Sequence, residues 1–137
     1  MKIAFSDPSF ARTGALVVGV FDGPSLTAAG KALDKKTGGA LGRAITASRF
    51  KGGKAQVLSL LAPEGLKASR LLLFGLGKAA DADDLVLQEA GGRIVAHLAT
   101  AGDTVANVLV ERPPKSKLKL AECAANLAYG ARLRSYR

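Results

Sequence analysis

The apolar residues of this chain fall into short β-branched runs that alternate with stretches of helical spacing. The run Ala15–Phe21 is rich in valine and has the composition of a strand buried on both faces. By the same criteria, and with Pro63-Glu64-Gly65 as a turn signal, the sequence predicts strands at residues 2–5, 15–21, 55–61, 70–74 and 104–110. The first of these has the weakest pattern.

Four further stretches place apolar residues on one helical face. The stripes are Leu26, Ala29 and Leu33; Leu41, Ala44 and Ile45; Leu87, Ala90, Ile94 and Leu98; and Leu120, Ala124, Leu127 and Ala131. The resulting order, β-β-α-α-β-β-α-β-α, is typical of an α/β fold with a mixed, mainly parallel central sheet flanked by helices. Because the 137 residues contain no repeat or internal linker, we expect residues 1–137 to form a single domain.

Glycines and one threonine give more local predictions. Gly91-Gly92 inside the third helix costs about 1 kcal/mol per glycine relative to alanine, which predicts a close approach to the sheet or a break in the helix. Thr37 is expected to cap the second helix, and Gly38-Gly39 to supply positive φ values where two helices meet. The side chains expected in the core include Leu73, Ile94, Val108 and Leu127.

Several short segments, most of them containing glycine, follow one another along the chain in a characteristic order. They are Thr37-Gly38-Gly39, Leu41–Ile45, Ala47–Gly52, Leu61-Ala62-Pro63, Leu72–Lys78 and Leu133–Arg137. In this order and at these spacings they resemble the N-terminal domain of the leucine aminopeptidase family, the cytosolic kind that uses two metal ions. The resemblance runs from about Leu33 to the last residue.

The resemblance implies both a fold and a role. The family's N-terminal domain is an α/β sandwich of three layers, similar to macro domains. Full-length members remove N-terminal residues from peptides with two divalent metals, commonly zinc, manganese or magnesium, and usually assemble as hexamers. Their ligands, a lysine and several carboxylates, lie in a C-terminal domain with no counterpart here. The resemblance therefore implies a non-catalytic chain without metal or cofactor, whose partners are the C-terminal domain and sister subunits, and which serves assembly or access control.

The formal net charge of +9 is the one unusual feature of the composition. Seven basic residues lie between positions 31 and 54 against one acid, and seven more between 111 and 137 against two. The candidates for binding a polyanion are Lys35, Lys36, Arg43, Arg49, Lys51 and Lys54. One interpretation is a DNA-binding adaptor that uses segments 31–54 and 112–137. The other is a surface that faces an acidic domain or subunit, which the scarcity of aromatic stacking residues favours.

The loop Gly75-Leu76-Gly77-Lys78 lies where a phosphate-binding loop would lie, after a strand and before a helix. It lacks the third glycine of the dinucleotide fingerprint and the spacing of a P-loop. Two interpretations stay open. The loop is either a turn after a buried strand or the remnant of a nucleotide or ADP-ribose site, which would make the chain a macro-like binding module.

Residues that could carry chemistry are few. His97 is the only histidine, which excludes a metal site built on two or three histidines, and we expect it to be structural. Cys123 lies among alanines and is expected in the core. Asp81, Asp83 and Asp84 lack the spacing of a calcium loop, so we expect Asp81 to cap the third helix. We therefore predict no catalytic residue and no metal ligand in this chain.

The expected compartment follows from what the sequence lacks. No apolar run approaches the about 18–20 residues that a membrane span needs. The segment Met1–Pro8 has no apolar core of a secretory signal, and a single cysteine cannot form an intramolecular disulfide. We expect a cytoplasmic protein that does not bind membranes.

Overall fold

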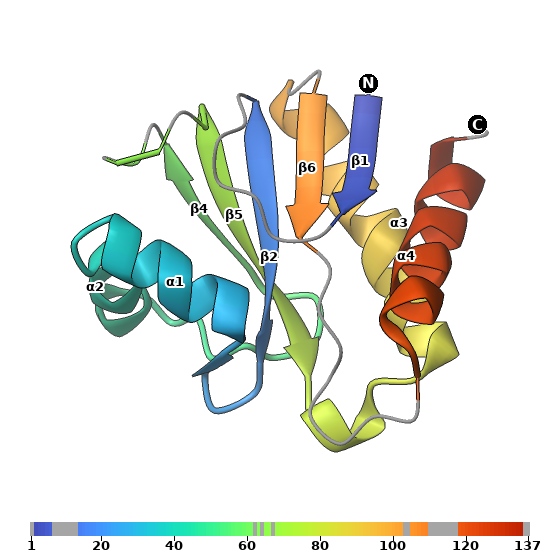
Figure 1. Cartoon of the computed structure of the whole chain (residues 1–137), viewed down its shortest axis with the longest axis horizontal. Helices are drawn as coiled ribbons and strands as arrows, with labels where there is room; N and C mark the ends of the chain where they lie inside the picture. The colour runs from blue at the N-terminus through green and yellow to red at the C-terminus, as the bar shows by residue number, and fades with distance from the viewer. Residues whose placement is uncertain are drawn as a thin grey trace.

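A central sheet covered by helices on both faces organises the chain in the computed structural model (Figure 1). The structure describes residues 2–6, 14–61, 63, 65–66, 68–102, 105–109 and 118–135. Its elements are β1 (Lys2–Ser6), β2 (Ala15–Phe21), β3 (Ser25–Leu26), α1 (Ala28–Lys36), α2 (Ala40–Ala47), β4 (Val57–Leu61), β5 (Arg70–Gly77), the 3₁₀ turn η1 (Ala79–Asp81), α3 (Asp84–Ala101), β6 (Val105–Leu109) and α4 (Leu120–Ser135). The order predicted from the sequence is confirmed, with β3 and η1 as additions. Residues 104 and 110 of the fifth predicted strand lie outside the described part.

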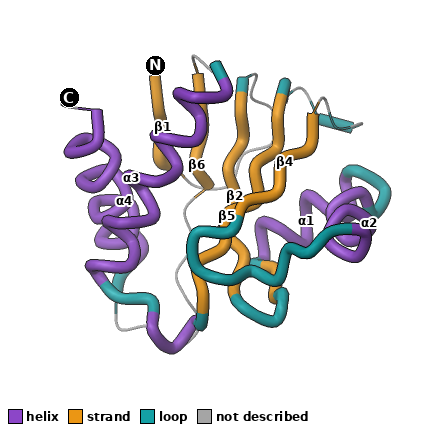
Figure 2. Tube along the Cα trace, turned by 180° about the vertical axis from the view of Figure 1, so that it is seen from behind, coloured by secondary structure: helices purple, strands orange, loops and turns teal. Residues whose placement is uncertain are grey.

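The sheet is mixed and mainly parallel, as predicted. Its strand order is β1-β6-β2-β5-β4, and β3 pairs with the end of β2. The pairs β1–β6, β6–β2 and β2–β5 are parallel, whereas β4 pairs with β5 in the antiparallel direction. Two parallel strands must be joined by a crossover, and α3 provides the crossover between β5 and β6. Figure 2 shows α3 and α4 on one face of the sheet and α1 and α2 on the other.

Each face of the sheet carries its own apolar core. Side chains alternate along β2, so that Val17 packs beneath α3 and α4 while Val18 packs beneath α1. Burial on both faces explains the continuous apolar run of this strand. The four side chains predicted to be buried are all at most 7% exposed, namely Leu73, Ile94, Val108 and Leu127.

The corner between α1 and α2 corrects one prediction. Thr37 does not cap α2; it ends α1, where its hydroxyl donates to the carbonyl oxygen of Leu33 at 2.8 Å. The residue before α2 is Gly39, which has no side chain to cap the helix. The Asp34 carboxylate from α1 takes that role and accepts a hydrogen bond from the Gly42 N–H at 2.9 Å. Gly38 and Gly39 have φ values of 69° and 87°, so the predicted positive φ values are confirmed.

Two further predictions, both about α3, are wrong. Asp83, not Asp81, caps it, because Asp81 is part of η1 and the Asp83 carboxylate accepts from the Val86 N–H at 2.9 Å. The helix is continuous through Gly91, so the predicted break is wrong. The predicted approach to the sheet is also wrong, since a Cβ on Gly91 would overlap the carbonyl oxygen of Leu127 in α4.

Candidate functional site

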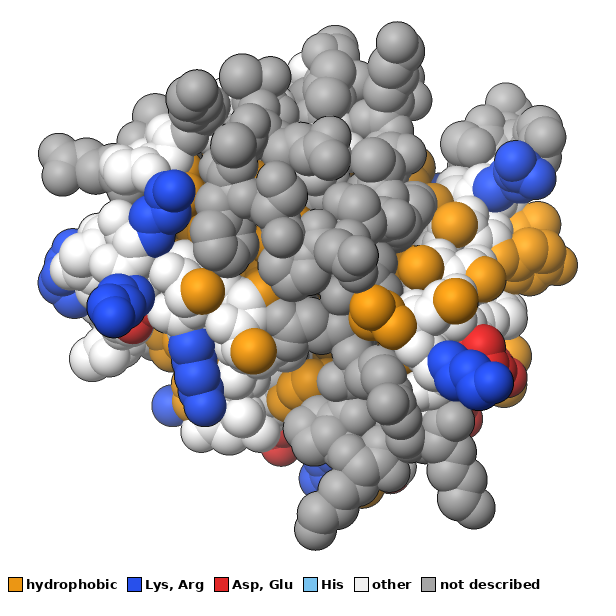
Figure 3. Space-filling view, viewed as in Figure 1, with side chains coloured by type: hydrophobic (Ala, Val, Ile, Leu, Met, Phe, Trp, Pro, Cys, Tyr) orange, Lys and Arg blue, Asp and Glu red, His pale blue; other side chains and the backbone are white. Residues whose placement is uncertain are grey.

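Helices α1 and α2 carry a cluster of cations on the outer side of the molecule. Figure 3 shows lysine and arginine side chains gathered over these two helices. We define the α1–α2 basic surface by its exposed cations, Lys31, Lys35, Lys36, Arg43, Arg49 and Lys51. Asp34 lies among them but is half-buried and bonded to the start of α2. Of the six residues predicted to bind a polyanion, Lys35, Lys36 and Arg43 thus lie on α1 and α2, whereas Arg49 and Lys51 follow the end of α2.

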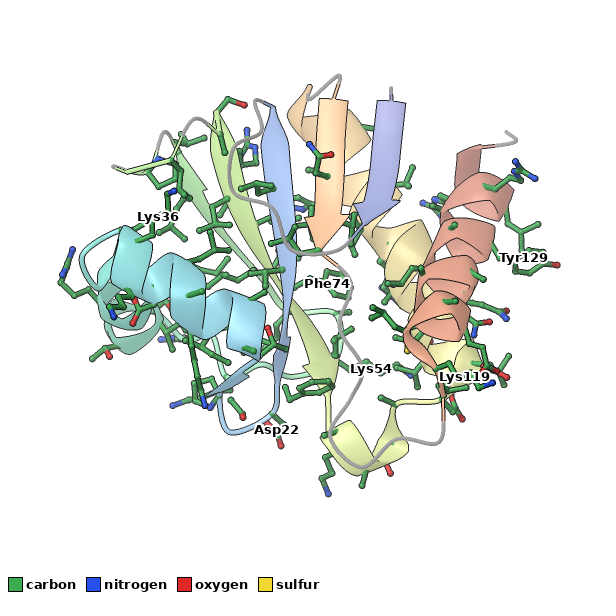
Figure 4. The ribbon with its side chains drawn as sticks, viewed as in Figure 1. Asp22, Lys36, Lys54, Phe74, Lys119 and Tyr129 are labelled. Atoms are coloured by element: carbon green, nitrogen blue, oxygen red, sulfur yellow. The ribbon has the colours of Figure 1, made fainter. Side chains whose placement is uncertain are left out.

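Lys54, the sixth, does not belong to this surface. Its Nζ lies 3.2 Å from Oε2 of Glu89 on α3, and the other oxygen of that carboxylate lies 3.1 Å from Nη2 of Arg93. The hydrogen bonds from Lys54 and then Arg93 hold the pKa of Glu89 below its ordinary value. Figure 4 shows Lys54 and Lys36 well apart, with the sheet between them.

The second basic segment lies on another side of the molecule. Its described cations, Lys119, Arg132 and Arg134, belong to α4 or its start. Helix α4 covers the opposite face of the sheet from α1 and α2 (Figure 2). The described cations of the two segments therefore do not form one continuous face. Residues 112, 115, 117 and 137 lie outside the described part.

The predicted ligand loop is mostly strand: β5 extends to Gly77, three residues beyond the predicted end, so that Gly75, Leu76 and Gly77 form its carboxyl end. This is the edge at which open α/β sheets bind ligands. The N–H groups of Gly75 and Gly77 donate to the carbonyl oxygens of Gln56 and Gly52, at 2.7 and 3.0 Å. They already have partners and are not directed at a phosphate. A Cβ on Gly75 would overlap the carbonyl oxygen of Gly53, so a close approach of two backbone segments explains this glycine. The side chain of Lys78 is exposed.

Apolar side chains fill the space beside this loop. The cavity that Phe21, Phe74 and Leu76 line together with described residues of α3, α4 and β6 measures about 30 Å³. Ligand pockets usually measure about 300–1,000 Å³. The side chain of Leu76 covers Gly19, because a Cβ there would lie 2.6 Å from Leu76 Cδ1. This cavity is therefore far too small to hold a nucleotide.

The described residues do not fit a metal centre. Nowhere among them do three or more histidine, cysteine, aspartate or glutamate side chains come together as potential ligands. His97 is half-buried on α3, and Cys123 is fully buried in the core, as predicted. Asp83 caps α3, and Asp84 accepts from the Asn126 amide at 2.7 Å. A two-metal peptidase centre therefore has no ligand set in the described part of the chain.

The helices of the described part also include none that is long and apolar enough to cross a membrane.

One feature was not predicted: a groove of about 870 Å³ along the outer face of α3. Helix α4 forms one wall, and residues around β4 and β5 form the other. Three exposed apolar side chains line it, Val57, Leu85 and Leu133, which are 38%, 73% and 55% exposed. Leu85 and Leu133 fall outside the apolar stripes of their helices, and this was the available signal in the sequence.

Known proteins of similar sequence are cytosol aminopeptidases. A probable cytosol aminopeptidase of Rhodopseudomonas palustris is 40% identical over 138 residues, and one of Bradyrhizobium is 41% identical over 140 residues. Each alignment covers the whole of this chain but 27% of the relative. The chain thus spans about a quarter of the length of these curated relatives.

Solved structures support the fold. A tomato leucine aminopeptidase mutant superposes with a TM-score of 0.74 at 20% identity, over 100% of this chain and 28% of its own. The macrodomain of Mycobacterium tuberculosis DarG has a TM-score of 0.68 at 12% identity, over 96% of this chain and 90% of its own. The predicted macro-domain-like sandwich is therefore confirmed.

The family itself follows from the sequence match. Residues 17–137 match the family described as the cytosol aminopeptidase family, N-terminal domain. This range runs from Val17 within β2 to the end of the chain and includes all but Ala15 and Leu16 of the two apolar cores, and it confirms the resemblance carried by the glycine-punctuated segments. The chain belongs to the cytosol aminopeptidase family and corresponds to its N-terminal domain.

Proposed function

We propose that residues 1–137 act as a non-catalytic domain of a metal-dependent aminopeptidase that removes N-terminal residues from peptides. The family match over residues 17–137 is the observation that carries this proposal. Two further observations support it. The relatives are nearly four times as long as this chain, and no cluster of metal-ligating side chains occurs among the described residues.

In this proposal the catalytic domain lies in the remainder of the family's polypeptide. That domain would hold the two divalent metals, zinc, manganese or magnesium, and would supply the peptidase chemistry. The present domain would contribute to assembly, as in a cytoplasmic hexamer, or to control of access to the active sites. Its partners would be the catalytic domain and sister subunits.

The first prediction concerns catalysis by the chain alone. Because the described residues provide no ligand set for a metal, we expect no turnover of a leucine anilide by the purified chain with added manganese or zinc. The measurement is release of the aniline product, with a full-length relative as the positive control. Metal-dependent turnover that remains with the chain through successive purification steps would contradict the proposal.

A chimera tests the role in the longer protein. This chain would replace the first 27% of the Rhodopseudomonas palustris relative, the share to which it corresponds. We expect the chimera to hydrolyse the anilide and to retain the relative's oligomeric state in analytical ultracentrifugation. A chimera that folds but loses both properties would exclude an equivalent role for this domain.

A second candidate function, weak binding of duplex DNA, is favoured by the α1–α2 basic surface. If its six cations each contact a phosphate, we expect the affinity to fall by about 10³-fold between 50 and 200 mM salt, because counterions are released on binding. Fluorescence anisotropy with a labelled duplex measures this slope. Charge reversal of Lys35, Lys36 and Lys51 should reduce both the affinity and the slope.

The matched control is Lys119→Glu, an exposed cation at the start of α4 on the opposite face of the sheet. It changes the net charge by the same amount per residue but leaves the α1–α2 basic surface intact. If single charge reversals at Lys119 and at Lys35 lowered the affinity for DNA equally, net charge alone would drive binding. Absence of binding at 50 mM salt would favour an acidic protein partner for this surface.

The alternative of a nucleotide- or ADP-ribose-binding module stays a prediction. No described feature favours it, since the backbone amides of Gly75 and Gly77 are bonded to neighbouring carbonyl oxygens. Thermal stabilisation of the purified chain by ADP-ribose would revive this interpretation.

A further inference from the structure

The groove along α3 is a concave surface with exposed apolar walls. Its floor is the outward face of α3 from Leu85 to His97, which at 1.5 Å per residue corresponds to about 18 Å. Ala96 in this floor carries no long side chain, and Gly92, four residues before it, borders α4, where the Gly130 carbonyl oxygen and the Arg134 Cβ lie next to it. The floor is therefore long enough to contact about three turns of another helix.

The walls supply apolar contacts to such a helix. Leu85 projects from the first turn of α3, Leu133 from α4, and Val57 from the edge strand β4. They make up three of the six exposed large hydrophobic residues of the described part of the chain. Their concentration around one groove is typical of a protein interaction site rather than of a solvated surface. Figure 1 shows α3 between α4 and the strands, with α4 to the right.

The charges around the groove select the kind of partner. Arg93 flanks the floor on α3, and Arg134 stands on the α4 wall. Glu89 is the acidic side chain in the lining, and both Lys54 and Arg93 already contact it. Two arginines against one glutamate give the lining of the groove a net positive charge, and the whole chain carries a net charge of +9. A second copy of this chain would bring the same charge, so electrostatic complementarity favours an acidic partner.

We propose that this groove binds an acidic amphipathic helix of a partner protein, with the apolar face of that helix on Gly92 and Ala96. Carboxylates on the two flanks of the incoming helix would pair with Arg93 and Arg134. Apolar side chains would contact Leu85 and Leu133. This mode of recognition, a helix in a groove, uses anchors at positions i, i+3, i+4 and i+7.

The experiment uses two synthetic 16-residue amphipathic helical peptides. Both have alanine and leucine on the apolar face; one has glutamate and the other lysine on both flanks. Each peptide is titrated into the ¹⁵N-labelled chain, and the amide signals are followed by NMR. The acidic peptide should shift the amide signals of Gly92, Arg93 and Ala96. We expect the basic peptide to bind at least about tenfold more weakly, because like charges oppose each other across the rim.

Two variants test the site itself. Ala96→Phe fills the floor of the groove, and Arg134→Glu reverses the charge of one wall. Each substitution should lower the affinity for the acidic peptide by about tenfold or more. Lys119→Glu is the matched control, an exposed cation just before the start of α4, at the opposite end of that helix from Arg134, and it should leave binding unchanged. Circular dichroism melting of each variant separates loss of binding from loss of folding. If Ala96→Phe unfolds the chain, the result for Arg134→Glu alone tests whether the peptide binds in the groove.

Three results would overturn the proposal. They are equal binding of both peptides, shifts confined to another surface, and no shift up to about 1 mM peptide, which corresponds to about 4 kcal/mol of binding free energy. A concentration-dependent dimer that Ala96→Phe dissociates would also overturn it, by assigning the groove to a second copy. None of these results depends on peptidase activity, so the inference and the proposed function can fail separately.

Discussion

Replacing Gly130 with alanine is expected to destabilise the folded chain by about 3 kcal/mol, the upper part of the range for overpacked core positions. Gly130 lies in α4 against α3, and a Cβ at this position would overlap the carbonyl oxygen of Gln88. Gly91 of α3 stands in the reciprocal position against Leu127. Because both obstacles are backbone atoms, no side-chain rotation can relieve the overlap, and the two helices must separate.

The expected destabilisation by Gly130→Ala is opposite in sign to the usual effect of replacing glycine with alanine in a helix. In an exposed helix interior, replacing glycine with alanine stabilises by about 1 kcal/mol, because alanine loses less conformational entropy on folding. Gly92→Ala is the matched control, since its Cβ would lie 3.4 Å from the carbonyl oxygen of Gly130, within ordinary contact. We expect Gly92→Ala to be neutral or stabilising in urea unfolding. Stabilisation by Gly130→Ala as well would show that α3 and α4 are not in close contact.

Replacing Leu73 with alanine is expected to cost about 2–5 kcal/mol, the range for large-to-small changes in a core. Leu73 is fully buried in β5, between Val18 of β2 and Leu58 of β4, in the core beneath α1 and α2. The substitution removes buried methyl groups and leaves a cavity that a strand with neighbours on both sides can close only in part. Chemical denaturation of the variant measures the loss.

Leu61→Ala on the adjacent strand is the matched control. The same atoms are removed, but Leu61 is 70% exposed, so we expect a change within about 0.5 kcal/mol. Equal effects of the two substitutions would contradict the placement of Leu73 in the core. A large effect at Leu61 alone would mean that the edge of the sheet is covered in solution.

Local patterns predicted the elements well. The run Ala15–Phe21 was sufficient to predict β2, because a strand buried on both faces needs apolar residues at every position. The stripe that includes Leu87 and Ile94 predicted the buried face of α3 in the same way. Both properties depend on the periodicity of a single element, and a single sequence contains that information.

The exact ends of helices were less predictable. Asp81 and Asp83 are both good helix caps by residue type. In the folded chain Asp83 caps α3, because residues 79–81 form a 3₁₀ turn that includes Asp81. Thr37 was expected to begin one helix and instead ends another, since its hydroxyl reaches the last turn of α1. In each case the residue type was compatible with two local conformations, and the surrounding contacts decided between them.

The sequence by itself determined the family, the α/β class and the strongly basic character of the segment that became α1 and α2. Only the tertiary structure decided that Lys54 pairs with Glu89 on α3 while Lys35 stays on the basic surface. Only it decided that Gly91 faces α4, and that Leu85 and Leu133 line one groove. The physical reason is common to all three. A pattern along the chain fixes which face of an element is apolar, whereas its neighbours depend on how distant elements pack.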